Sequence, residues 1–110
     1  MPIQFPGTLT TLSRASQAAL RSALDAFSRT DAGLARSVLD ADDAIDDQQD
    51  EVIRTTIREL EQRRGSASQE VDVILLAKPL ERVADHATNI AEDVILVAEA
   101  RNVKHASKLG

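Results

Sequence analysis

The sequence predicts an all-α fold, an antiparallel three-helix bundle with up-down-up topology. Composition is the first reason. A chain of 110 residues with only 4 glycines and 3 prolines has too few turn-forming residues for a turn-rich β domain. The second reason is that apolar residues recur at spacings of three and four in three long segments. Only two short breaks separate these segments, and short connections make consecutive helices antiparallel neighbours. We therefore expect residues 1–110 to form a single three-helix domain, with helices over about 8–29, 32–64 and 68–101.

The first two segments each carry one apolar row. The row of the first segment is Leu9, Leu12, Ser16 as a small polar member, Ala19 or Leu20, Ala23 and Phe27. The row of the second segment is Leu34, Val38, Ala41, Ile45, Val52, Thr56 and Leu60, with Gln48 or Gln49 as a polar interruption. Between the two segments, Thr30 or Asp31 can cap the second helix by accepting its first free N–H groups. At its end, Arg63 and Arg64 suit the last turn and Gly65 suits a left-handed cap.

The third segment carries two apolar rows. The main row is Leu76, Leu80, Val83, Ala87, Ile90, Val94 and Val97, and a second row of small residues is Ala77, Ala84, Ala91 and Ala98. Ser66 to Gln69 has the form of a capping box at the start of this helix. Pro79 lies inside the pattern, so we expect a kink there or a helix that restarts at the proline. So wide an apolar face favours self-association.

Composition also excludes several classes of protein. Without cysteine there is no disulfide, thiolate metal site or cysteine nucleophile. A net charge of −5 argues against general binding to nucleic acid or to an anionic membrane. There is no apolar run long enough to span a bilayer and no secretory signal, so a cytoplasmic location is expected.

Acidic side chains are grouped along one side of each of the last two helices. On the third helix, Glu81, Asp85 and Glu92 lie within about 40° of one another at 100° per residue. On the second helix, Asp42 and Asp46 are four residues apart along the edge of the apolar stripe. In an antiparallel bundle such strips can face the same groove. Like charges at this spacing repel, so the arrangement requires an explanation.

Two interpretations of these carboxylates remain open on spacing alone. One is a cation site, because clustered carboxylates become favourable when a hard ion compensates them. The other is a solvated acidic face, for which the available ion-pair partners are Arg36, Arg54, Arg58 and Arg82. The remaining aspartates of the second helix point elsewhere and are expected to be plain surface; they are Asp40, Asp43, Asp47 and Asp50.

The two histidines do not indicate an enzyme. Val83 and Asn102 precede His86 and His105 by three residues, so the Glu-x-x-His pairs of di-iron helical bundles are absent. There is also no glycine-rich phosphate loop and no nucleophile elbow. We expect His86 to be a surface or interface residue and the basic tail around His105 to be frayed.

The segment Leu80–Val94, LERVADHATNIAEDV, resembles the signature of the PhoU family of phosphate-transport regulators, which reads like LERIGDHATNIAE. Upstream residues resemble the family's preceding helices, and Asn102 to His105 resembles its tail. The likeness covers nearly the whole chain from about Leu20 onward. The resemblance implies an all-helical fold of two tandem three-helix repeats, so this chain corresponds to one repeat, most like the C-terminal one.

The resemblance also implies a function and a site. The family's metal-binding Glu/Asp-x-x-x-Asp motifs fall here on Asp42 and Asp46 and on Glu81 and Asp85, with Asn89 and Glu92 as auxiliary ligands for divalent or iron ions (Fe, Mn, Mg or Zn). Family members restrain phosphate uptake and signalling by contacting the ATPase of a phosphate transporter and a membrane sensor histidine kinase, and they are not enzymes. We therefore expect a cytoplasmic regulatory adaptor that forms a homodimer, binds no nucleic acid and reaches the membrane only through its partners. The alternatives are a helical oligomerisation or interaction domain without a metal role, and a half-domain that regulates another carrier.

Two departures from the family pattern concern the site. Ala84 replaces the usual glycine, and Pro79 precedes the Leu-Glu-Arg block. A bend near this position is expected to impair ligand geometry and lower metal affinity.

Overall fold

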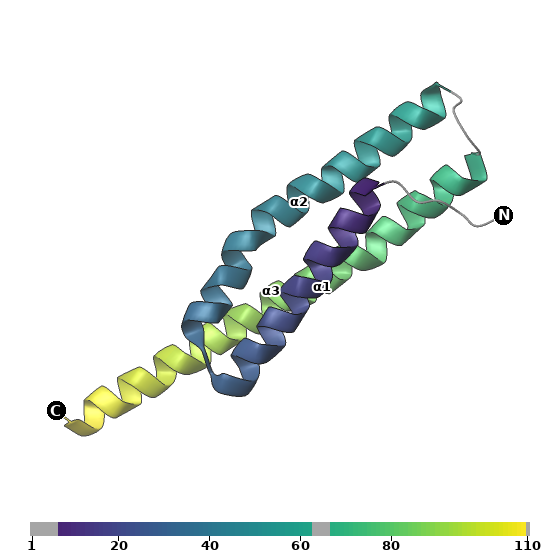
Figure 1. The fold of residues 1–110 in the computed structure, drawn as a ribbon. Coiled ribbons are helices and arrows are strands. Elements are labelled where there is room, and N and C mark those ends of the chain that lie inside the picture. Colours follow the sequence, from purple (N-terminus) through teal and green to yellow (C-terminus); the bar gives the residue numbers. More distant parts are fainter. Residues whose placement is uncertain (1–6, 63–66, 110) are drawn as a thin grey trace.

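The structure, a computed structural model, is a bundle of three helices in up-down-up order. It describes residues 7–62 and 67–109, with side chains placed for 7–62 and 70–104. Helix α1 spans Gly7–Arg29, α2 spans Ala32–Glu61 and α3 spans Ala67–Leu109 (Figure 1). Each helix contacts both others, so the three surround one core. The predicted all-α fold class is confirmed.

The ends of the helices differ from the expected ones mainly in α3. This helix continues to Leu109 instead of ending near residue 101, and the backbone of the basic tail is therefore helical and not frayed. It also passes through Pro79 without a break, which excludes a restart at that residue. The features expected between α2 and α3 lie outside the residues with placed side chains. They are the end of α2 at Arg63, Arg64 and Gly65 and the capping box from Ser66 to Gln69.

The molecule is a rod whose length is set by α3. Its extents are 68 × 23 × 16 Å. At a rise of 1.5 Å per residue, a helix of 43 residues is about 65 Å long. Figure 1 shows α3 running past both other helices, with its C-terminal end projecting beyond the α1–α2 turn. In the described part of the chain, no helix has the length and apolarity needed to cross a membrane.

A tight turn joins α1 to α2. Thr30 adopts a left-handed conformation with φ 52°, and the Asp31 N–H donates to the Ala26 carbonyl at 2.9 Å. This bond is the long closing bond of a Schellman-type helix end. The Asp31 side chain then accepts from the Leu34 N–H at 3.0 Å. Asp31 is therefore the N-cap of α2, and Thr30 is the strained residue that reverses the chain.

The core consists mainly of small and β-branched side chains. Its buried apolar members are Leu9, Leu12, Ala19, Ala23, Ala26, Ala35, Val38, Ile45, Val52, Val73, Ala77, Ala84, Ala87, Ala91 and Val94. Among the residues with placed side chains, four polar ones are buried with them: Ser16, Gln49, Thr56 and Glu70. Thr56 is satisfied by donating to the Val52 carbonyl at 2.7 Å. The alanines let the helix backbones approach closely, since they add little bulk between them.

The helices are rotated relative to the expected apolar rows. In α3 the row of small residues with Ala77 and Ala84 faces the core, whereas Leu76 and Val97 are 43% and 45% exposed. In α1, Ala26 is buried and Phe27 is 67% exposed, and in α2 Ala41 is exposed as well. Close packing on alanine explains the rotation, because it leaves the larger side chains at the margins of the seam instead of inside it.

Candidate functional site

Four carboxylates lie along the edge where α2 and α3 pack side by side. Asp42 and Asp46 come from α2, and Glu81 and Asp85 come from α3; we call this set the acidic edge. The two helices are antiparallel neighbours, and the second members of the two pairs, Asp46 and Asp85, lie close enough for their charges to interact. Asp42 is half-buried, and the other three side chains are exposed.

Two hydrogen bonds across the α2–α3 seam bracket the acidic edge. Gln49 Nε2 donates to Glu81 Oε2 at 2.8 Å, and Thr88 Oγ1 donates to Asp42 Oδ1 at 3.1 Å. Each helix thus carries a carboxylate, a second carboxylate four residues later and a neutral donor three residues after that. Because the helices are antiparallel, the neutral donor of each one meets the outer carboxylate of the other. Asp46 and Asp85 are left between the two bonds.

Negative charge is concentrated at the centre of the acidic edge. Desolvation at the helix surface and the nearby charges of Asp42 and Asp85 raise the pKa of Asp46, with smaller contributions from Asp43 and Asp50. Neighbouring negative charges disfavour ionisation of a carboxyl group. The centre of the acidic edge is therefore a place where a cation would be electrostatically favoured.

The donor chemistry of the acidic edge fits a hard cation, but its side chains do not converge. Carboxylate, amide and hydroxyl oxygens are the ligands that such ions take. Among the described side chains, the ion pairs are Arg36–Glu99 and Arg54–Glu51, neither of which uses these carboxylates. Nowhere in residues with placed side chains do three acidic or histidine groups come together as a metal ligand set. Binding an ion at this edge requires exposed side chains to change rotamer.

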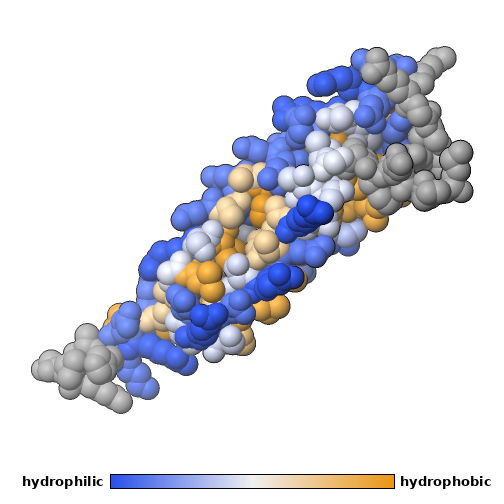
Figure 2. Space-filling model, viewed as in Figure 1, coloured by the Kyte–Doolittle hydropathy of each residue, from blue (hydrophilic) through white to orange (hydrophobic). Residues whose placement is uncertain are grey.

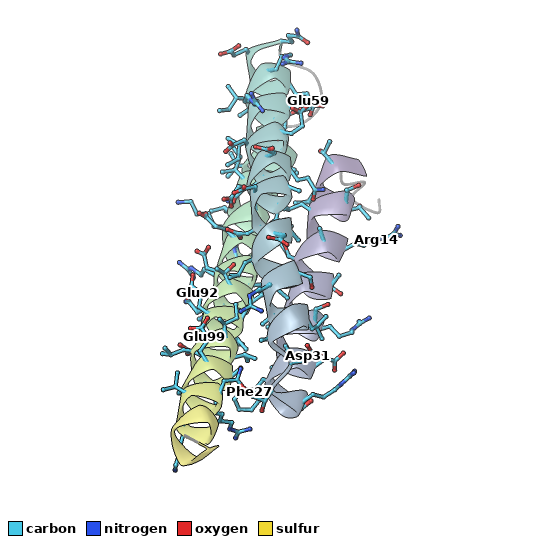
Figure 3. The ribbon with its side chains drawn as sticks, turned by 90° about the vertical axis from the view of Figure 1, so that its left-hand side faces the viewer. Arg14, Phe27, Asp31, Glu59, Glu92 and Glu99 are labelled. Atoms are coloured by element: carbon cyan, nitrogen blue, oxygen red, sulfur yellow. The ribbon has the colours of Figure 1, made fainter. Side chains whose placement is uncertain are left out.

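The two auxiliary residues lie further along α3. Asn89 and Glu92 are both exposed. Figure 3 shows Glu92 projecting from α3 on the side away from α1. Neither residue hydrogen-bonds to the acidic edge within the part of the chain that the structure describes.

Gln49 and Thr88 are the residues that spacing arguments undervalued. Gln49 is only 8% exposed. From the sequence it was interpreted only as a polar interruption of the apolar row of α2. The single hydroxyl proton of Thr88 is shared between Asp42 and the Ala84 carbonyl, which is also 3.1 Å away, and this holds the hydroxyl against α3. Their shared position, three residues after the second carboxylate of each pair, was the signal in the sequence that could have identified them.

Comparison with known proteins places this arrangement in a family. The family model described as PhoU domain matches residues 9–94, which include the whole acidic edge. The chain belongs to the PhoU family. This membership confirms the resemblance inferred from the Leu80–Val94 block. No solved structure gives a significant match.

Several relatives of this chain are named phosphate-specific transport system accessory protein PhoU homolog. The protein of Pseudomonas putida is 40% identical over 86 residues, covering 78% of this chain and 34% of the relative. The homolog of Pseudomonas aeruginosa is 36% identical over 89 residues, covering 81% and 37%. A homolog numbered 1 from Thermotoga maritima is 34% identical over 85 residues, covering 77% and 37%. The matched part of the chain thus spans well under half the length of these relatives.

The PhoU family consists of regulatory accessory proteins and not of enzymes. The expectation that this chain is not an enzyme agrees with that membership. The coarser part of the expected role, an association with phosphate transport, agrees with the names of the relatives.

Proposed function

We propose that this PhoU domain is a regulatory adaptor of phosphate transport and phosphate signalling. It acts in the cytoplasm by contacting the ATPase of a phosphate transporter and a sensor histidine kinase, and it functions as a homodimer. The observation that carries the proposal is the family match over residues 9–94. The names of the relatives, accessory proteins of a phosphate-specific transport system, support the same role.

The proposed adaptor binds a divalent or iron ion, such as Fe, Mn, Mg or Zn, at the acidic edge. Asp42, Asp46, Glu81 and Asp85 hold the ion. Asn89 and Glu92 act as auxiliary ligands. A bound ion supplies positive charge that compensates the four carboxylates. The raised pKa of Asp46 supports this proposal, because its causes after desolvation are the negative charges of Asp42 and Asp85, which a bound cation would compensate.

Metal binding is tested by isothermal titration and thermal melting with Mn²⁺, Fe²⁺, Mg²⁺ and Zn²⁺ in turn. We expect the unaltered chain to bind at least one of these ions and to melt at a higher temperature in its presence. The double variant Glu81→Ala and Asp85→Ala is expected to lose both effects. The matched control is Asp40→Ala with Asp47→Ala, which removes the same charge from exposed positions of α2 outside the acidic edge. Equal responses in the two double variants contradict the assignment of the site.

The adaptor role is tested by capture of a phosphate-transporter ATPase on the purified chain. We expect specific capture, and we expect phosphate-responsive gene expression to rise in cells that lack the protein. If the ATPase and the sensor kinase both fail to bind while the chain is folded, the adaptor proposal is wrong.

A second function is favoured by one observation. Because no three acidic or histidine side chains converge in the described part of the chain, the acidic edge also fits a solvated face of a helical interaction domain. That alternative predicts a stable assembly whose formation and melting temperature do not respond to any of the four ions.

A further inference from the structure

A row of apolar side chains on α3 lies outside the core, on the flank that faces the groove with α1. Its members are Leu76, Val83, Ile90 and Val97, and we call them the flank row. They follow one another at intervals of seven residues, the repeat of a helix that packs along a second helix. Leu76 and Val97 are 43% and 45% exposed, while the two inner members are half-buried. Figure 2 shows apolar side chains reaching the surface along the rod.

Two hollows border the flank row, one at each end. The first, of about 540 Å³, is lined by Leu76, Pro79 and Leu80 of α3 together with the N-terminal half of α1, including Arg14. The second, of about 180 Å³, is lined by Val97, Asp93 and Arg101 of α3 together with Phe27 of α1. Figure 3 shows Phe27 at this end of the rod. The α1–α3 groove is therefore hollowed near both ends of the flank row.

Charged residues are placed symmetrically about the flank row. Asp72 lies four residues before Leu76, and Arg101 lies four residues after Val97. Arg101 is exposed, and its Nη1 donates to Thr30 Oγ1 at 3.2 Å. This bond holds the guanidinium at the rim of the second hollow and leaves four of its five N–H groups for other acceptors.

This pattern is self-complementary for an antiparallel neighbour. If Leu76 of one copy lies opposite Val97 of another, then Val83 lies opposite Ile90 and Asp72 lies opposite Arg101. The same alignment sets Asp93 of the second copy opposite Leu80, at the hollow that Arg14 lines. A parallel alignment instead sets Asp72 against Asp72 and Arg101 against Arg101. The evenly spaced apolar row fits either orientation, and the charges select the antiparallel one.

We propose that two copies of this chain pair through the α1–α3 groove, with their α3 helices antiparallel about a two-fold axis between His86 and Ala87. The occupant of the groove is α3 of the second copy. The inference deepens the homodimer of the proposed function by naming its surface and register. This inference concerns only the association of two copies. If it is wrong, the proposed contact with a phosphate transporter is not affected.

Charge reversal tests the register in the full chain. The unaltered chain is expected to sediment as a dimer, and Asp72→Arg or Arg101→Asp alone should weaken dimerisation about tenfold. Combining both reversals restores the opposite charges, so dimerisation should return to within about threefold of the original. Circular dichroism establishes that each variant is helical. A monomeric unaltered chain, or a double variant weaker than both single ones, overturns the proposal.

Cysteine cross-linking tests the orientation, because the chain has no cysteine of its own. His86→Cys, next to the proposed axis, is expected to form a covalent dimer rapidly on mild oxidation. Asp72→Cys should not cross-link to itself but should cross-link when mixed with Arg101→Cys. The control is Lys78→Cys, which is exposed on another side of α3. Self-linking of Asp72→Cys, or linking of the control as fast as His86→Cys, overturns the antiparallel arrangement.

Discussion

In the described part of the chain, Thr30 is the one residue other than glycine whose φ is positive. Its φ of 52° is a left-handed conformation that β-branched residues rarely adopt. Such a conformation costs roughly 1–3 kcal/mol. The strain persists because the turn is closed on both sides, by the Asp31 to Ala26 hydrogen bond and by the Asp31 cap of α2.

Thr30→Gly is therefore expected to stabilise the protein by about 1 kcal/mol, since glycine adopts this conformation without a steric penalty. The loss of the exposed bond from Arg101 offsets part of the gain. Urea denaturation followed by circular dichroism measures the change. The control, Thr11→Gly, places glycine at an exposed position within α1 and should destabilise by about 1 kcal/mol. A Thr30→Gly chain no more stable than the original contradicts the claim of strain.

Asp46 gives a second prediction for a single residue, on the pH dependence of stability. Its pKa is raised above the ordinary value of 3.8 by desolvation and by Asp42 and Asp85. The folded state thus binds the proton more tightly than the unfolded state, and this residue lowers stability as pH rises through its folded pKa. Asp46→Asn should stabilise the protein at neutral pH by about 0.3 kcal/mol.

The gain from Asp46→Asn is expected to vanish when the pH falls below 3.8, where the carboxyl is protonated in both states. Denaturation curves at several pH values measure it. Asp47→Asn, at an exposed position next along α2, serves as the control and should give a smaller gain. A gain that grows toward low pH contradicts the direction of the pKa shift.

At the scale of the element, α3 contains an internal proline that does not end it. Pro79 is exposed and lies within the helix Ala67–Leu109. It has no N–H to donate to the Leu75 carbonyl, and its ring crowds that carbonyl. Packing of Ala77 and Ala84 against the core on either side holds the helix together across this defect.

Pro79→Ala is accordingly expected to raise the free energy of unfolding by about 2 kcal/mol, because alanine restores the helical hydrogen bond. Lys78→Ala, the exposed neighbour, should change stability by less than about 0.5 kcal/mol. Thermal and urea unfolding at low protein concentration, where the chain is monomeric, separate this effect from association. If Pro79→Ala is neutral or destabilising, the proline is not the weak point of α3.

For the whole molecule, a core built of small residues places much of the stability on its few large members. Leu12 is fully buried, whereas Leu96 is 65% exposed. Leu12→Ala should destabilise by about 3 kcal/mol, a large part of the stability of a small domain. Leu96→Ala removes the same atoms from an exposed site of α3 and should cost less than about 1 kcal/mol. Comparable losses in the two variants, measured by urea denaturation, contradict the assigned core.

Much of the fold and of the acidic edge was predictable from local patterns. Apolar spacing and two short breaks specify three helices, and short connections make neighbours antiparallel. A pair of carboxylates four residues apart on each of two neighbouring helices predicts two acidic strips at one edge. Local sequence also limited the cap of α2 to Thr30 or Asp31, and the structure assigns it to Asp31. These features were accessible because each depends on residues within a few turns of one another.

The rotation and axial register of the helices were decided only by tertiary packing. Periodicity gives the direction of a side chain relative to its own helix, but not relative to a neighbouring helix. Alanine rows allow the closest approach, and their packing therefore turned Phe27, Leu76 and Val97 toward solvent. Register across the α2–α3 seam likewise determined that Gln49 meets Glu81 and Thr88 meets Asp42. Such contacts join residues far apart in the chain, so no local spacing specifies them.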